Sequence, residues 1–331
     1  MMKSKINTIL KGIFFVLITN TLLNANESLD NYRKNGIDNI AKIMDLELTD
    51  KAYWAQYISN KDTRFGFTEE FESIITCDKE KSKLALFVKN KEEKYELAKE
   101  HNAFTGKNSG DKTLEGDLKT PVGIYRIVNK LSKETNLDSF YGPLAFVTSY
   151  PNIYDRYQKK NGHGIWIHGL PTAQERDSYT KGCIAIENES IECLGRKINH
   201  KNTLLIINNT KVEQNFSKEL LASLLSELFK WRYTWIYSDI DGYLNFYSSD
   251  FVRDDGMEYE TFKTYKKRVF QKDEKKTITF QNISVIPYPD KKDVYKITFK
   301  EDYRSDTFRF NGDKSLMVHY KDNKMKIFAE R

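Results

Sequence analysis

The sequence predicts a multidomain protein with a small, mostly helical N-terminal region, a β-rich central domain and an α+β C-terminal domain. The chain has 331 residues, which is enough for about two or three domains. Apolar residues recur at helical spacing near the N-terminus and again after Phe216. Between these two regions, short apolar runs alternate with glycines and a proline, as is typical of strands joined by tight turns.

Residues 1–25 have the features of an export signal. Three lysines precede the apolar run 12–18, and small and polar residues follow as far as Ala25. This order is that of a positive n-region, a short h-region and a cleavage site. The apolar run is well short of the roughly 20 residues that a membrane span needs. We therefore expect an exported protein that is cleaved near Ala25, rather than an anchored one.

The charge of the chain is small and evenly distributed. The formal net charge is +6, and removal of residues 1–25 takes away three lysines and no acid, which leaves +3. Acidic and basic residues are interleaved along the rest of the chain. A nucleic-acid partner is not expected, because it would require a concentrated basic face.

The odd number of cysteines predicts at least one free or intermolecular thiol. The chain has three cysteines, Cys77, Cys183 and Cys193. Cys77 and Cys193 could pair in an oxidising compartment, or both could be buried and unpaired. The sequence leaves these two alternatives open.

The N-terminal region, residues 26–82, is predicted to be helical. Its apolar residues follow a helical period and are Ile37, Ile40, Ile43, Met44, Trp54, Tyr57 and Ile58. A region of this size has a marginal core by itself. We therefore expect it to pack on the next domain or on a second copy of the chain.

The central domain, residues 83–210, is predicted to be β-rich. It opens with a hairpin formed by the apolar runs 84–88 and 95–99. Turns are expected at 116–125 and 141–144, a strand at 165–168, a short helix at 185–194 and a closing strand at 203–207.

The C-terminal domain, residues 215–331, is predicted to be a curved sheet over a helix. A long amphipathic helix is expected at 216–237, followed by helical pieces after Asp239 and at 257–270. The expected strands are 277–287, 294–301, 306–310, 315–320 and 325–329. The aromatic residues of the helical part are expected to form core rather than a ligand site; they are Trp231, Trp235, Tyr243, Phe246 and Tyr247.

The chemistry of the chain is predicted to centre on Cys183 and His168. A thiolate attacks carbonyls, an imidazole accepts its proton, and a glycine lets backbone amides approach the developing oxyanion. Strand alternation places Trp166 and His168 on the same face, at the end of a strand. Gly182 permits an unusual backbone conformation directly before the cysteine, and a nearby Lys181 ammonium would favour the thiolate.

Five ordered motifs resemble one known family. The matching segments are Gly116-Asp117, Thr120-Pro121-Val122-Gly123-Ile124-Tyr125, Tyr141-Gly142, His168-Gly169 and Thr180-Lys181-Gly182-Cys183-Ile184. Together they resemble the L,D-transpeptidase (YkuD-type) catalytic domain of bacterial cell-wall enzymes. The resemblance spans the whole central domain.

The resemblance implies a role for each residue of the motif. Cys183 would be the nucleophile, and His168 the general base and later the acid. The Gly169 carbonyl would orient the imidazole, and the amides of Gly182 and Cys183 would form the oxyanion hole. The substrate would be a peptidoglycan stem peptide, attacked at the L-centre carbonyl of diaminopimelate before the terminal D-alanine. An amine acceptor would then give a 3-3 crosslink, and water would give carboxypeptidation.

Three departures from the common transpeptidase pattern favour trimming over crosslinking. Lys181 stands where a histidine is usual, Ile184 and Ala185 stand where an arginine often follows the cysteine, and the interval from His168 to Cys183 is short. The domain order also resembles the periplasmic cell-shape L,D-carboxypeptidases of helical and curved bacteria. These have a dimerising N-terminal region and an NTF2-like C-terminal domain, which implies a possible homodimer here. The alternatives are an L,D-transpeptidase and an inactive wall-binding module.

Several residues near the motif are candidate substrate contacts. Arg176 and Lys181 are the cations closest in sequence that could bind a carboxylate, and His163 could line the entrance. Trp166 and Thr180 complete this set. The remaining histidines are isolated, and none has metal-ligand spacing with another histidine or cysteine; they are His101, His200 and His319. We expect no metal and no cofactor.

Overall fold

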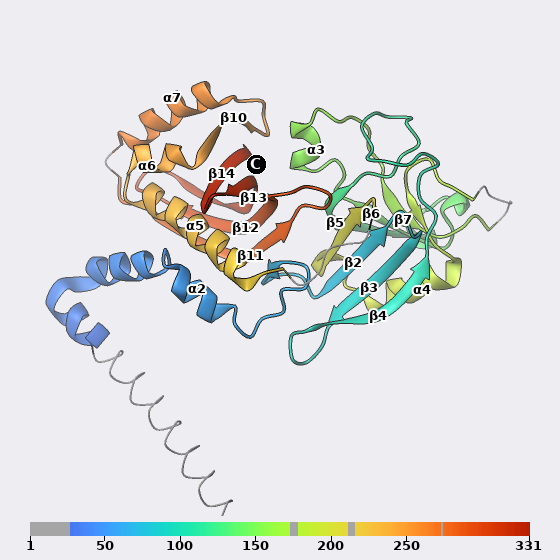
Figure 1. Ribbon diagram of the computed structural model, residues 1–331, viewed down its shortest axis with the longest axis horizontal. Helices are drawn as coiled ribbons and strands as arrows, with labels where there is room; N and C mark the ends of the chain where they lie inside the picture. The colour runs from blue at the N-terminus through green and yellow to red at the C-terminus, as the bar shows by residue number, and fades with distance from the viewer. Residues whose placement is uncertain (1–26, 173–177, 211–215, 273) are drawn as a thin grey trace, which may run out of the picture.

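The computed structural model describes residues 27–172, 178–210, 216–272 and 274–331. Two β-sheets dominate it, one in the central domain and one in the C-terminal domain, and the N-terminal helices lie beside the C-terminal domain (Figure 1). The export signal predicted for residues 1–25 and the candidate contact Arg176 lie outside the described residues.

The N-terminal helices pack on the C-terminal domain. Residues 27–47 are helical, with a positive φ of 79° at Gly36, and α2 (Lys51–Tyr57) follows. The side chain of Trp54 is 4% exposed and belongs to the C-terminal core, where its ring centroid lies 4.8 Å from that of Phe229. Helix α2 therefore obtains its core from the domain farthest from it in sequence, and not from the domain that follows it.

The predicted helical region 26–82 is too long at its C-terminal end. Two strands lie within it, β1 (Phe67–Thr68) and β2 (Ser73–Asp78). Residues 73–77 of β2 are all buried, so both faces of the strand carry core side chains. A strand buried on both faces has no alternation, and a short apolar run of this kind cannot be separated from a helix by periodicity.

The central domain is built on an eight-stranded sheet. Its order is β4-β3-β2-β9-β5-β6-β7-β8. The remaining strands are β3 (Lys83–Lys89), β4 (Tyr95–Asn102), β5 (Gly123–Ser132), β6 (Leu144–Thr148), β7 (Trp166–His168), β8 (Ile184–Ala185) and β9 (Thr203–Asn208). The predicted hairpin is β3-β4. The predicted closing strand is β9, which lies inside the sheet, parallel to β2 and antiparallel to β5.

Short helices connect the strands of the central domain. They are η1 (Lys133–Thr135), η2 (Ser139–Tyr141), α3 (Ile153–Tyr157), α4 (Asn188–Lys197) and η3 (His200–Asn202). Helix α4 contacts β6 and buries Ile191 and Leu194 in the core of the central domain. The helix predicted at 185–194 is thus present, but it begins three residues later because Ile184 and Ala185 form β8.

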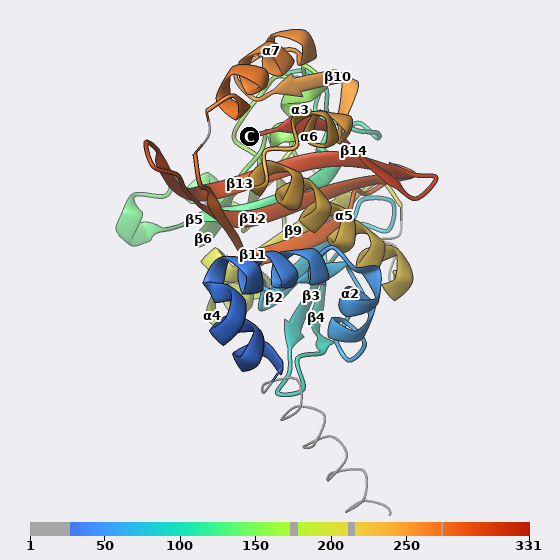
Figure 2. The same ribbon diagram turned by 90° about the vertical axis from the view of Figure 1, so that its left-hand side faces the viewer.

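The C-terminal domain is a six-stranded sheet packed against helix α5 (Lys218–Ile236), as Figure 2 shows. The sheet order is β1-β11-β12-β13-β14-β10. The other elements are α6 (Ile240–Asn245), β10 (Tyr247–Arg253), α7 (Tyr259–Phe270), β11 (Thr277–Pro287), β12 (Val294–Arg304), β13 (Arg309–Lys321) and β14 (Lys324–Glu330). Two predicted strands merge into β13. Of the predicted core aromatics, Phe246 is partly buried and the other four are buried.

A shared hydrophobic core joins the central and C-terminal domains. Phe71, Ile124 and Leu204 of the central domain pack with Ile286 and Phe328 of the C-terminal domain, and all five are nearly inaccessible to solvent. Polar groups also bridge the two domains, since Asn152 donates to the Tyr288 hydroxyl at 3.0 Å.

Candidate active site

His168 is the last residue of β7 and is held in place by its backbone neighbours. It pairs with Ala145 of β6 on one side and with Ala185 of β8 on the other. Its side chain is 3% exposed, and Nδ1 lies 2.6 Å from the Gly169 carbonyl oxygen. An Nδ1–H that donates to this carbonyl leaves Nε2 as the nitrogen that can accept a proton.

Cys183 directly precedes β8 and is held by the hydroxyl of Thr180. Thr180 Oγ1 accepts from the Gly182 amide at 3.0 Å and donates to the Cys183 carbonyl at 2.6 Å. The Cys183 thiol is partly exposed, and Sγ lies 3.4 Å from the Gly164 carbonyl oxygen. Since β8 pairs with β7, the residue that follows Cys183 lies beside the strand that carries His168.

Glycine is required at position 182 for two reasons. Its φ is 136°, a conformation that L-residues rarely adopt. A Cβ at this position would also lie 2.9 Å from the Lys119 carbonyl oxygen. The close approach of these two backbone segments fixes the turn that presents Cys183.

Asp117 holds the backbone of Lys119 in its position next to Gly182. The Asp117 carboxylate accepts from the amides of Thr113, Leu114 and Lys119 and forms an ion pair with the buried Lys112 at 2.8 Å. Burial raises the pKa of Asp117, but the Lys112 ammonium and the three amides outweigh it and hold the pKa well below its ordinary range. Asp117 is therefore a structural anion of the active-site framework.

An aromatic cluster surrounds His168. The ring of Tyr141 lies edge-on to the imidazole, with centroids 5.1 Å apart, and 4.8 Å from the ring of Trp166. Burial and the nearby Cys183 raise the pKa of Tyr141, so its hydroxyl stays neutral and can donate a hydrogen bond.

The turn after His168 is closed by Asn188, the first residue of α4. Asn188 Oδ1 accepts from the Leu170 amide at 2.7 Å, and Gly169 donates to the carbonyls of Tyr141 and Leu144. A Cβ on Gly169 would lie 2.4 Å from Asn188 Oδ1. Gly169 thus allows the turn that brings its own carbonyl to Nδ1 of His168.

The structure brings together only some of the predicted site residues. Trp166 packs on Tyr141, whose ring lies against His168, while Thr180 is buried and acts on the backbone of Cys183. Lys181 is exposed, and His163 is exposed with Nδ1 4.0 Å from Glu115. The Gly182 amide already donates to Thr180 Oγ1, so in this conformation it does not point to an oxyanion as expected.

Two residues of the framework were not among the predicted site residues. Tyr141 belongs to a motif that the sequence shows, but only the fold places its ring against His168. Asn188 has no signal in the sequence, because its role depends on the position of α4 relative to the turn at Gly169.

The remaining cysteines and histidines form no second centre. Cys77 and Cys193 do not form a disulfide, and burial raises the pKa of Cys77 to about 12. In the described ranges, no three histidine, cysteine or acidic side chains are grouped as metal ligands. No helix among the described residues has both the length and the apolar character needed to cross a bilayer.

Comparison with known proteins agrees with this geometry. Residues 72–207 match the L,D-transpeptidase catalytic domain (YkuD), and residues 223–331 match the Cds6 C-terminal NTF2-like domain. The helical cell shape determining protein Pgp2 from Campylobacter jejuni is 36% identical, with a TM-score of 0.77, and the match covers 86% of this chain and 100% of that one. The chain belongs to the YkuD L,D-transpeptidase family.

Solved structures that resemble this chain match it over nearly its whole length and not over the YkuD domain alone. A point mutant of the same Campylobacter jejuni Pgp2 matches with a TM-score of 0.78 at 36% identity, over 86% of this chain and 98% of that one. Bd1075 of Bdellovibrio bacteriovorus is 28% identical, with a TM-score of 0.64, over 82% of this chain and 96% of that one. No curated protein sequence matches. The chain is thus a YkuD protein with a short helical N-terminal region and an NTF2-like C-terminal domain.

Proposed function

We propose that this protein is a peptidoglycan L,D-carboxypeptidase that removes the terminal D-alanine from stem tetrapeptides to give tripeptides. The observation that carries the proposal is the placement of His168. Its Nδ1 lies 2.6 Å from the Gly169 carbonyl oxygen, while its strand pairs with the strand that begins immediately after Cys183. A thiol and an oriented imidazole on adjacent strands are the pair that acyl transfer requires.

The proposed reaction has two steps. The Cys183 thiolate attacks the carbonyl at the L-centre of diaminopimelate after His168 Nε2 has taken the thiol proton. The tetrahedral intermediate breaks its C–N bond, and His168 returns the proton to the leaving D-alanine amine. Water, deprotonated by His168, then attacks the thioester and releases the tripeptide and the Cys183 thiol. The Cys183 amide is the remaining backbone candidate for the oxyanion.

The surroundings of Cys183 favour water over an amine as the acceptor. Ile184 and Ala185, which follow the cysteine, are fully buried in β8, so neither position offers a cation to the carboxylate of an acceptor stem. Lys181, at the position before Gly182, points into solvent. Positions 184 and 185 therefore lack the cation, and position 181 the imidazole, that are common in crosslinking relatives.

We further propose that the protein acts in the periplasm and affects cell shape. The export signal predicted at residues 1–25 and the relationship to Pgp2, whose name describes it as a helical cell shape determining protein, support this role. A homodimer through the N-terminal region is also proposed. Large apolar side chains of helix 27–47 are exposed, with Leu29 at 64%, Ile37 at 63% and Leu46 at 57%.

Mass analysis of products tests the proposed reaction. The mature protein should release D-alanine from a disaccharide tetrapeptide and leave the disaccharide tripeptide. Cys183→Ala should abolish release, whereas Cys193→Ala, which alters a free thiol on α4, should retain it. Formation of 3-3 dimers from two tetrapeptides would identify a transpeptidase instead. Full activity of Cys183→Ala would exclude the mechanism.

A further inference from the structure

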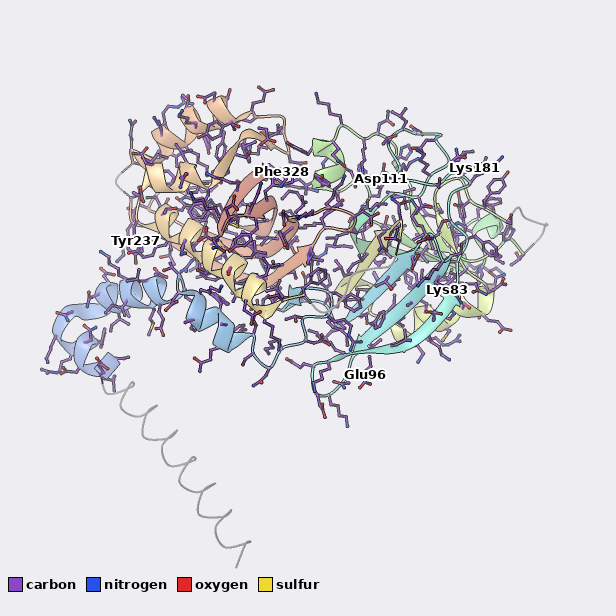
Figure 3. All side chains as sticks on the ribbon, viewed as in Figure 1. Lys83, Glu96, Asp111, Lys181, Tyr237 and Phe328 are labelled. Atoms are coloured by element: carbon purple, nitrogen blue, oxygen red, sulfur yellow. The ribbon has the colours of Figure 1, made fainter. Side chains whose placement is uncertain are left out.

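A cavity lies between the central and the C-terminal domain, away from Cys183. Its volume is about 380 Å³, and its walls come from β5 on one side and from β11, β12 and β13 on the other. Neither Cys183 nor His168 lines it. Figure 3 shows Lys181 near the end of the central domain farthest from Tyr237, whereas Phe328 of the shared core lies toward the middle of the molecule.

Lys296 of β12 places a buried ammonium group at this cavity. The residue is 7% exposed, and Nζ donates to the Ile124 carbonyl at 3.1 Å. The hydrogen-bond partner of this nitrogen is thus a neutral carbonyl and not a carboxylate. An ammonium has three N–H donors, so Lys296 keeps donor capacity for a ligand. Burial lowers the pKa of Lys296 to about 8 although Asp155 is near enough to oppose this, so a bound anion would further favour the charged form.

Arg156 provides a second buried donor at the same cavity. Its Nε binds Asp254 at 2.6 Å and Nη1 binds the Pro151 carbonyl at 2.6 Å, but Nη2 is buried without a hydrogen-bond partner. Arg331 also lines the cavity and shares Asp254, at 3.4 Å. Two guanidinium groups thus share one carboxylate, and the cavity lining holds more cationic side chains than acidic ones, of which it has Glu70 and Asp313.

Apolar side chains form only part of the cavity wall, beside polar and charged residues such as Glu70, Ser149 and Asp313. Phe71, Ile124 and Ile286 line it, and each is at most 3% exposed. A cavity of this volume accommodates a small organic ligand rather than a lone ion. A partly apolar wall with an excess of cationic side chains fits a peptide whose carboxylate binds the donors.

We propose that this interdomain cavity binds the carboxylate of a short peptide through Lys296 and Arg156. The bound peptide would contact both domains at once, since Lys296 belongs to the C-terminal domain and Arg156 to the central domain. Stem peptides carry such carboxylates, so the source of the peptide, though not the chemistry of the site, rests on the proposed function. The site is separate from the one in which Cys183 would cut.

Isothermal titration of the mature chain tests the site. The probes are the stem tripeptide that lacks the terminal D-alanine, the same tripeptide with every carboxyl amidated, and inorganic phosphate. Binding of the tripeptide should weaken by about 10-fold or more in Lys296→Met, because a hydrogen bond between charged groups is lost. Arg331→Gln, at a side chain that is 66% exposed, should weaken binding without loss of the fold. Lys321→Met, on β13 but outside the cavity, is the matched control.

Each outcome decides one part of the inference. Equal affinity of Lys296→Met and Lys321→Met, at matched melting temperatures, overturns the site. If Lys296→Met does not fold, an unchanged affinity of Arg331→Gln overturns it. If the amidated tripeptide binds as tightly as the tripeptide, the cavity does not recognise a carboxylate. If phosphate binds as tightly as the tripeptide, the cavity does not select a peptide. Release of D-alanine is measured on the same variants. If release is absent while binding is retained, the proposed reaction fails and this site stands.

Discussion

Thr180 and Cys183 are joined by a hydrogen bond of 2.6 Å from the threonine hydroxyl to the cysteine carbonyl. The same oxygen accepts from the Gly182 amide, so a single side chain closes the turn that presents the thiol. Backbone hydrogen bonds also hold Thr180 itself: its amide donates to the Thr105 carbonyl, and its carbonyl accepts from the Lys107 amide. Thr180 thereby determines the position of the nucleophile.

Thr180→Val should lower kcat for D-alanine release by about 10-fold or more, because the isosteric side chain removes both hydrogen bonds of the turn and leaves buried polar groups unpaired. Thr180→Ser keeps the hydroxyl and should restore most of the rate. Steady-state kinetics on the tetrapeptide measure both variants. Thr135→Val, which removes a threonine hydroxyl from η1 outside the site, is the control. Equal rates for Thr180→Val and Thr180→Ser would contradict the role of the hydroxyl.

Gly169→Ala should reduce D-alanine release with little change in the binding of the tetrapeptide. The added Cβ would lie 2.4 Å from Asn188 Oδ1 and 2.9 Å from Pro143 Cδ, so the turn must shift and carry its carbonyl away from His168 Nδ1. NMR of the imidazole Nδ1–H measures this contact directly. An unshifted Nδ1–H signal together with normal kcat would show that Gly169 does not orient the ring.

The sequence predicts those parts of the fold that depend on local pattern. Helix α5 and strand β11 follow from periodicity and composition, and β11 has the predicted bounds. Strand β2 lies in the region predicted to be helical, because burial on both faces removes its alternation. The start of strand β10 falls in a predicted helical piece, because Tyr247 follows α6 closely and continues its aromatic pattern.

The residues of the candidate active site likewise differ in whether a local sequence pattern can reveal them. Cys183 and His168 are recognisable from their motifs, since the chemistry restricts the residue types. The contact between Asn188 and the turn at Gly169 depends on how α4 packs on the sheet, which no local pattern reveals. The hydrogen bond from the Gly182 amide to Thr180 Oγ1 likewise depends on the conformation of the turn, which the order of residues does not reveal.

Trp54→Ala should destabilise the protein by about 3 to 5 kcal/mol, because it leaves a large cavity in the core of the C-terminal domain. Urea unfolding followed by far-UV circular dichroism measures the change. Gln56→Ala, on the exposed side of the same helix, should change the free energy of unfolding by less than about 0.5 kcal/mol. If the two variants are equally stable, α2 is only loosely associated with that core.

Glu301 should make the protein less stable as the pH rises from about 4.5 to about 7. The pKa of this carboxyl is raised from 4.5 to about 7, chiefly by burial, with the Lys314 ammonium opposing the rise and the neighbouring Glu330 adding to it. In this window the unfolded chain has lost the proton that the folded protein keeps, so the free energy of unfolding falls with increasing pH. A shift of this size corresponds to a few kcal/mol, at about 1.4 kcal/mol for each pKa unit.

The variant Glu301→Gln removes this titration and isolates its effect. The difference in the free energy of unfolding between pH 4.5 and pH 8 should be smaller in Glu301→Gln than in the parent protein, by about 1 to 3 kcal/mol. Asp302→Asn changes the next residue, whose carboxylate pairs with Arg304 at the surface and whose pKa that contact lowers. A carboxyl whose pKa is lowered on folding does not cause stability to fall as the pH rises. In Asp302→Asn, the decrease in the free energy of unfolding between pH 4.5 and pH 8 should therefore be at least as large as in the parent protein. A Glu301→Gln profile that runs parallel to the parent profile would show that Glu301 titrates normally in the folded protein.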